Sequence, residues 1–238
     1  MSLPLEHVFI PAQRTGGPLL VLLHGTGADE HDLLPLGESI KSDMDADLAV
    51  LSLRAPLEAE YGGHCWFNGF SSAPAEGAVA TTVPASCRLV VECCRLAPPL
   101  FKTDPQRTVL LGFSQGSTIG WSVATCSWPR PALLAGVLLM SGRLFPDVAT
   151  PGTPLAAAAA PPAELSGRRI WVTHGRLDGT TPVALARESL DTARLLWRDD
   201  EAFTTDVIFA PHNSGHDIPS VSVQAACDVL HTWLVIKT

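Results

Sequence analysis

The chain has 238 residues, of which 46% are hydrophobic, and its formal net charge is −8. This length and composition predict a single globular domain over residues 1–238, and the acidic balance argues against nucleic acid or an anionic membrane as a partner. The first apolar run, Leu19–Leu23, is far too short to span a bilayer, and no secretory leader is recognisable. We therefore expect a cytoplasmic protein without stable membrane insertion.

Strand-like apolar runs alternate with helix-like segments along the chain. The expected strands are His7–Pro11, Leu19–His24, Asp47–Leu53, Thr108–Phe113, Leu134–Met140, Arg169–Thr173 and Thr205–Phe209. The expected helices are Glu30–Ser42, Ala80–Leu96, Gln115–Ser127, Pro182–Arg198 and Ser220–Ile236. Several strand runs lack polar alternation, which is typical of parallel strands buried on both faces. The pattern predicts a doubly wound, mainly parallel α/β sheet of about seven strands flanked by helices, with function at the carboxyl ends of the strands.

Two segments interrupt this alternation. Residues 54–79 form a long connection that is rich in glycine, alanine and aromatic residues, and a long connection in a compact domain is often functional. Residues 150–162 combine prolines with an alanine run, which predicts a surface excursion. Neither segment is long enough for a large cap domain.

The six cysteines are scattered, and none forms a Cys-x-x-Cys pair. The sequence therefore favours free buried thiols over a metal site or a disulfide framework. We expect no metal and no other cofactor.

The pentapeptide Gly112-Phe113-Ser114-Gln115-Gly116 lies between an expected strand and an expected helix. This is the nucleophile-elbow pattern of α/β-hydrolases, in which a tight turn exposes the serine hydroxyl and the flanking glycines avoid a clash. The helix that follows presents free N–H groups to a developing negative charge. Ser114 is therefore the candidate nucleophile.

A serine nucleophile needs a base and a carboxylate that orients the base. His216 follows the last expected strand and is the candidate base, with His212 as a rival loop histidine. Asp178 follows the strand before it and is the candidate acid. Two other carboxylates compete with it, although one would lie at the wrong end of the sheet (Asp206) and the other follows an earlier strand (Asp147). The order serine, aspartate, histidine is the order expected of an α/β-hydrolase.

An oxyanion hole requires two N–H donors near the nucleophile. The backbone N–H of Gln115 is one candidate, because it follows the nucleophile directly. The glycine-rich turn His24-Gly25-Thr26-Gly27 follows an early strand, and the N–H of Thr26 is the candidate for the second donor.

These motifs together resemble the phospholipase/carboxylesterase family of α/β-hydrolases, which includes acyl-protein thioesterases and small bacterial carboxylesterases. The matching pieces run in family order over nearly the whole chain: Leu23-His24-Gly25-Thr26-Gly27, Arg54-Ala55-Pro56, Gly62-Gly63, Trp66-Phe67, the elbow, Ser141-Gly142, His174-Gly175 with Asp178, and Gly215-His216. The resemblance implies a triad of Ser114, Asp178 and His216, an oxyanion hole from Thr26 and Gln115, and an acyl pocket lined by Trp66 and Phe67. Family members are often monomers or homodimers.

We expect a serine carboxylesterase that acts on small esters with short to medium apolar acyl groups. The uncharged, aromatic segment Trp66–Phe70 indicates an apolar acyl group, and short to medium chains are expected because no large apolar cap domain is visible. Phe70 is included among the candidate substrate-binding residues. An acyl-protein thioesterase or a lysophospholipase needs the same triad and stays open as an alternative. A non-catalytic binding protein, a dienelactone-type hydrolase and a small peptidase are more remote, because the triad is complete, the nucleophile is serine and no added domain is visible.

Overall fold

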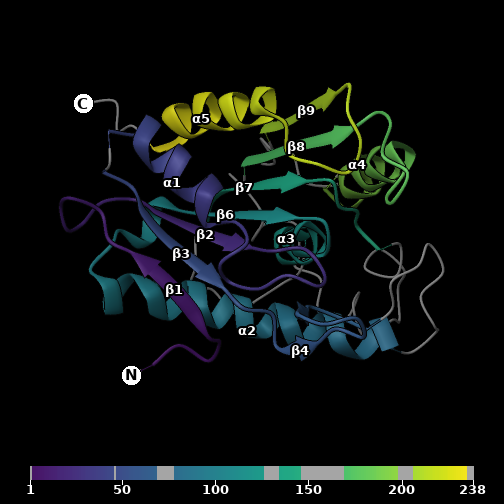
Figure 1. Cartoon of the computed structure of the whole chain (residues 1–238). Helices are drawn as coiled ribbons and strands as arrows, with labels where there is room; N and C mark the ends of the chain where they lie inside the picture. Colours follow the sequence, from purple (N-terminus) through teal and green to yellow (C-terminus); the bar gives the residue numbers. More distant parts are fainter. Residues whose placement is uncertain are drawn as a thin grey trace.

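The computed structural model describes residues 2–45, 47–68, 78–125, 134–145, 169–197 and 206–234. A central sheet of seven strands carries helices on both faces (Figure 1). The strands of the sheet are β1 (His7–Ile10), β2 (Leu19–Leu23), β3 (Ala49–Leu53), β6 (Thr108–Phe113), β7 (Leu134–Met140), β8 (Arg169–Gly175) and β9 (Asp206–His212). The helices are α1 (Leu34–Asp43), α2 (Ala78–Phe101), α3 (Gln115–Thr125), α4 (Val183–Trp197) and α5 (Ser220–Leu234), with a short 3₁₀ helix at Pro105–Arg107. Two short strands, β4 (Leu57–Glu58) and β5 (His64–Cys65), pair with each other.

The strand order is β1-β3-β2-β6-β7-β8-β9, and only the pair β1 and β3 is antiparallel. This confirms the expected mainly parallel, doubly wound sheet. From β2 the chain continues to one side through β3, and from β6 it continues to the other side through β7, β8 and β9. The neighbours β2 and β6 are therefore the topological switch point, where ligands bind beyond the carboxyl ends of the strands.

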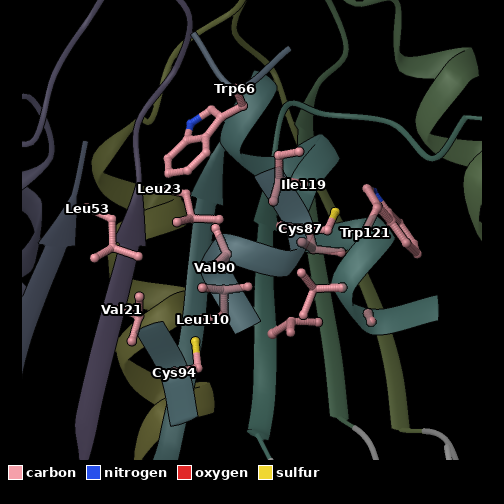
Figure 2. Close-up of a cluster of buried hydrophobic side chains, with 14 of the residues drawn as sticks. Val21, Leu23, Leu53, Trp66, Cys87, Val90, Cys94, Leu110, Ile119 and Trp121 are labelled. Carbon is pink, nitrogen blue, oxygen red and sulfur yellow. The ribbon is translucent and has the colours of Figure 1, made fainter. Parts of the chain in front are cut away.

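Two buried clusters cover the two faces of the sheet. Helices α2, α3 and α4 pack on one face and α1 and α5 on the other. Figure 2 shows part of the first cluster, where Leu23 and Leu110 from the sheet meet Val90 of α2 and Ile119 of α3. Every residue of β2 and β3 is buried, which explains why their sequences are apolar apart from Ser52 of β3.

Several element ends differ from expectation. The first helix begins at Leu34 rather than Glu30, because residues 30–33 form turns and Pro35 lies in the first turn of the helix. Helix α2 extends to Phe101 through Pro98 and Pro99, because its packing on the sheet outweighs the cost of the prolines.

The last two strands run further than expected. Strand β8 ends at Gly175 and β9 at His212, where Thr173 and Phe209 were expected, because the parallel pairing continues through His174 with Pro211 and Gly175 with His212. The expected start at Thr205 lies outside the described residues. This extension brings the chain segments that follow β8 and β9 side by side.

Candidate active site

Ser114 lies in the tight turn between β6 and α3 and has a φ of 54°, in the left-handed region that non-glycine residues rarely adopt. The turn leaves no room for side chains around it. A Cβ at Gly112 would lie 2.3 Å from the carbonyl oxygen of Gly116, and a Cβ at Gly116 would lie 2.1 Å from the carbonyl oxygen of Leu23. The two glycines are therefore required by contact distance, as the elbow pattern predicts.

The structure brings Ser114, Asp178 and His216 together. The hydroxyl of Ser114 lies 2.9 Å from Nε2 of His216, and Nδ1 of His216 lies 2.7 Å from Oδ2 of Asp178. With Nδ1 protonated, His216 donates to the carboxylate and accepts from the serine hydroxyl. The side chain of Asp178 is fully buried, whereas that of His216 is 20% exposed. This arrangement leaves the serine–histidine end of the chain of hydrogen bonds open to a substrate.

The carboxylate of Asp178 is held by backbone donors as well. Its Oδ1 accepts from the N–H groups of Thr180 and Thr181, at 2.9 and 2.7 Å. His174, which is fully buried, donates from Nε2 to the carbonyl of Thr181 at 2.6 Å and lies 3.3 Å from Oδ2 of Asp178. Burial lowers the pKa of His174, so this neighbour is neutral near pH 7. These bonds thus hold the Asp178 side chain in one orientation. Of the two histidines beside its carboxylate, His174 is buried and His216 is partly exposed.

The segments after β8 and β9 are hydrogen-bonded to each other. The N–H of Arg176 donates to the carbonyl of His212 at 2.8 Å, and the N–H of Leu177 donates to the carbonyl of Ser214 at 3.1 Å. A Cβ at Gly175 would lie 2.0 Å from the carbonyl oxygen of Gly215, so only glycine permits this approach. Asp178 and His216 therefore lie on two backbone segments that are hydrogen-bonded to each other.

The rivals of the candidate acid and base do not reach Ser114 in the described structure. His212 is the last residue of β9, is buried, and bonds from Nδ1 to the hydroxyl of Ser214, which donates in turn to Asp217. The expectation that it is a plain loop histidine is wrong, because the strand continues to it. Asp206 begins β9, at the opposite end of the strand from His212, as expected. Asp147 lies outside the described residues.

The glycine-rich turn after β2 lies beside the elbow. A Cβ at Gly25 would lie 3.4 Å from the Cβ of Ser114. The turn is fixed by β5, because the N–H of Gly27 donates to the carbonyl of His64 and the N–H of His64 donates to the carbonyl of Ala28. Thr26 follows Gly25 in this turn. Gln115, at the first position of α3, has no carbonyl one turn earlier within the helix to bond its N–H. Both expected oxyanion donors thus belong to segments that adjoin Ser114.

Two sets of polar contacts hold that turn and the residues that follow it. His24 is fully buried, donates from Nδ1 to the carbonyl of Gly25 and accepts at Nε2 from the N–H of Ala55. Desolvation lowers its pKa, so His24 stays neutral and keeps this acceptor. The Arg54 guanidinium forms a bidentate ion pair with Glu30, at 2.5 and 2.6 Å, and lowers the pKa of Glu30 to about 2. The motif around Arg54 therefore ties the segment that follows residues 24–27, the candidate oxyanion turn, to the end of β3.

Trp66 and Phe67 were expected to line the acyl pocket, and the structure places them differently. Trp66 has no exposed surface and donates from its indole N–H to the carbonyl of His24 at 2.8 Å. Figure 2 shows its ring beside Leu23, within the core. Trp66 therefore supports the oxyanion turn rather than offering a surface to a substrate. Phe67 is 5% exposed and meets the ring of Phe145 edge to face, 5.4 Å away. Phe70 lies outside the described residues.

The side chain of Gln115 has a role that the sequence did not suggest. Its Oε1 accepts from the N–H of Trp66 at 2.9 Å and its Nε2 donates to the carbonyl of Phe67 at 3.0 Å. The side chain of the residue after Ser114 therefore bonds the backbone of Trp66 and Phe67 to the elbow. The signal was present in the family pentapeptide, but only the fold shows what the amide binds.

The described cysteines and potential metal ligands lie as follows. Cys65, Cys87, Cys93, Cys94 and Cys227 are buried and form no disulfide with one another, and Cys126 lies outside the described residues. Burial raises the pKa of Cys65 and raises that of Cys93 to about 12. Within the described ranges, no group of three or more His, Cys, Asp or Glu side chains could hold a metal ion. No helix in this part of the chain is long and apolar enough to cross a membrane.

The sheet order and the serine at a strained strand-to-helix turn define an α/β-hydrolase fold, and no cap domain is present in the residues that the structure covers. A sequence model of the phospholipase/carboxylesterase family matches residues 6–234. The chain therefore belongs to this family of carboxylesterase and thioesterase hydrolases.

Solved structures similar to this one include two carboxylesterases and an acyl-protein thioesterase. The Bacillus cereus carboxylesterase has a TM-score of 0.74 and 23% identity, with 96% of this chain and 94% of that chain covered. The Mesorhizobium loti carboxylesterase has a TM-score of 0.75 and 20% identity, with 96% and 95% covered. The Zea mays acyl-protein thioesterase 2 has a TM-score of 0.75 and 20% identity, with 97% and 99% covered. These likenesses support the fold over its whole length.

Proposed function

We propose that the protein is a serine carboxylesterase that hydrolyses small esters through an acyl-enzyme on Ser114. The observation that carries the proposal is the position of His216, whose two ring nitrogens lie 2.9 Å from the Ser114 hydroxyl and 2.7 Å from the Asp178 carboxylate. The strained φ of Ser114 supports it further, because backbone strain at a partly exposed nucleophile is typical of catalytic turns.

In the first half of the reaction, His216 takes the proton of Ser114 as the hydroxyl oxygen attacks the ester carbonyl. Asp178 stabilises the imidazolium that forms and keeps its ring in place. The carbonyl oxygen becomes negative and is bound by the N–H groups of Thr26 and Gln115, at the start of α3, where the helix dipole also favours an anion. The tetrahedral intermediate then expels the alcohol, which takes the proton from His216.

In the second half, water attacks the acyl-serine ester. His216 accepts a proton from this water, and the same two N–H groups bind the second oxyanion. Collapse of this intermediate releases the carboxylic acid and returns the proton to Ser114. No cofactor takes part in either half.

The proposed substrate is a small ester with a short to medium apolar acyl group. The buried aromatic contact between Phe67 and Phe145 supports apolar surroundings near the elbow, which suit such a chain. The lack of a disulfide among the described cysteines is compatible with a reducing compartment, which supports a cytoplasmic location.

A fluorophosphonate probe tests the nucleophile directly. We expect covalent labelling of the wild type, loss of labelling in Ser114→Ala, and labelling equal to wild type in Ser42→Ala, which removes an exposed hydroxyl of α1 far along the chain. His216→Ala should label slowly, because the serine loses its base. Equal labelling of wild type and Ser114→Ala would refute the proposal.

A series of p-nitrophenyl esters of rising chain length tests the substrate. We expect the highest kcat/KM for short to medium acyl chains, and an optimum at long chains would contradict the proposal. Matched acyl thioesters in the same series test the thioesterase alternative, which the similarity to an acyl-protein thioesterase favours. A non-catalytic binding role predicts no turnover of any of these compounds and the same ligand affinity in wild type and Ser114→Ala.

A further inference from the structure

Arg143 follows the carboxyl end of β7, directly beside the elbow. A Cβ at Gly142 would lie 2.8 Å from the carbonyl oxygen of Ser114. The N–H of Arg143 donates to the hydroxyl of Thr118 at 3.4 Å, and the N–H of Thr118 donates to the carbonyl of Ser114 at 3.1 Å. The backbone of Arg143 therefore adjoins the first turn of α3, at the same edge of the sheet as the candidate nucleophile.

Within the described part of the chain, the guanidinium of Arg143 forms no ion pair and no hydrogen bond. Most arginines and lysines there form an ion pair or a hydrogen bond from the side chain. The cations without such a bond are Arg88, Lys102, Arg143, Arg176 and Arg187. Four of these are exposed to water, whereas Arg143 is half-buried. An arginine is rarely withdrawn from water without a group that accepts its hydrogen bonds.

The contacts of Arg143 only partly compensate for this burial. Its guanidinium carbon lies 4.7 Å from the ring centroid of Phe145, a cation–π contact that occupies one face of the guanidinium and none of its five N–H donors. The carboxylate of Glu188 on α4 raises the pKa of Arg143, but the larger effect of burial lowers it. Within the described residues, the in-plane donors of this planar fork, which fits a carboxylate, have no hydrogen-bond partner.

Phe145 also connects Arg143 to the aromatic segment beside the elbow. The ring of Phe145 contacts that of Phe67, and the carbonyl of Phe67 is bound by the side chain of Gln115. The guanidinium of Arg143 thus contacts Phe145, and Phe145 contacts Phe67, whose backbone is bonded to the residue after Ser114.

We propose that Arg143 binds a carboxylate at the far end of the acyl chain, so that the preferred substrates are half-esters of dicarboxylic acids. This inference rests on the proposed esterase function and narrows its substrate class. The terminal carboxylate forms a bidentate ion pair with the guanidinium. A negative charge at this end of the substrate offsets the desolvation cost of the half-buried guanidinium. A neutral acyl chain cannot offset it.

Three phenyl esters of nearly equal size test this assignment. Phenyl hexanoate is neutral, monophenyl adipate replaces its terminal methyl with a carboxylate, and 4-(hexanoyloxy)benzoate carries the carboxylate on the leaving group. We expect the wild type to prefer monophenyl adipate. Arg143→Met should lower kcat/KM for monophenyl adipate by about tenfold or more, mainly through KM, and change that for phenyl hexanoate by less than about twofold. Arg187→Met removes an equal, exposed charge from α4 and should leave both values unchanged.

The outcomes separate this inference from the proposed function. Ser114-dependent hydrolysis of phenyl hexanoate tests the function alone. An equal loss on both acyl substrates in Arg143→Met, or a wild type indifferent to the carboxylate, would overturn the role of Arg143. An Arg143-dependent preference for 4-(hexanoyloxy)benzoate would overturn the acyl-side placement. Calorimetric binding of adipate to Ser114→Ala, with and without Arg143→Met, decides the matter without turnover: we expect about tenfold weaker binding in the double variant, and equal binding would refute the proposal.

Discussion

Replacing Gln115 with leucine is expected to loosen the segment that the side-chain amide holds against the elbow. Leucine is similar in size and keeps the backbone N–H, so the variant isolates the two side-chain hydrogen bonds. It leaves the N–H of Trp66 and the carbonyl of Phe67 without partners, in residues that are 0% and 5% exposed. Each buried polar group left unsatisfied costs about 1–3 kcal/mol.

The two losses together amount to about 2–6 kcal/mol, which is a large part of the 5–15 kcal/mol by which a domain is typically stable. For a chain of this length, 1 kcal/mol shifts Tm by about 2–4 °C, so we expect Tm to fall by at least about 4 °C. The oxyanion turn should loosen as well, because the indole of Trp66 supports it through the carbonyl of His24. We therefore expect kcat for a neutral p-nitrophenyl ester to fall more than KM changes.

Thermal unfolding and steady-state kinetics on two further variants complete the test. Gln224→Leu removes an exposed amide on α5 that donates to Asp228, and we expect wild-type Tm and kcat. Gln115→Glu keeps an acceptor for the N–H of Trp66 but loses the donor to Phe67, so its Tm should be lowered too. A Gln115→Leu variant indistinguishable from Gln224→Leu in Tm and kcat would refute the reasoning.

Three further predictions concern other parts of the molecule. Gly175→Ala places a Cβ 2.0 Å from the carbonyl oxygen of Gly215, so kcat should fall by about 100-fold while circular dichroism shows a folded protein; unchanged kcat contradicts this contact. The pKa of Glu30 is about 2 in the folded state, below its ordinary value of 4.5, so its ion pair with Arg54 stabilises the fold above about pH 4.5 and is lost as the pH falls towards 2. In urea titrations at pH 6 and pH 3, Glu30→Gln should lose stability relative to wild type at pH 6 and less at pH 3; an equal difference at both pH values would count against the linkage. In a Cys126→Ser variant, a thiol reagent should react only after urea is added, because the five other thiols are buried, and rapid reaction without urea would contradict their burial.

The sequence by itself determined the fold class, the order of the elements and the three residues of the candidate triad. These follow from local features: apolar runs that are buried on both faces, glycines where a tight turn forbids a Cβ, and a serine, an aspartate and a histidine that each follow a strand. In a parallel sheet all such segments meet at one edge, so chain order was enough to bring together groups that are 102 and 38 residues apart. The identity of the acyl pocket did not follow, and the expected role of Trp66 in it was wrong.

Only the tertiary structure decided how the site is supported and what its charges face. The extra pairing of β8 with β9 buried His212, and the packing of the aromatic segment turned Trp66 inward and placed its backbone against the amide of Gln115. Whether Arg143 has a partner is likewise a property of the neighbours that the fold supplies. These contacts join segments that are far apart in the sequence and that no sequence pattern relates. They depend on which polar groups the fold buries next to each other. The physical reason is that burial and hydrogen-bond pairing are set by the assembled core, whereas strand and turn patterns are set residue by residue.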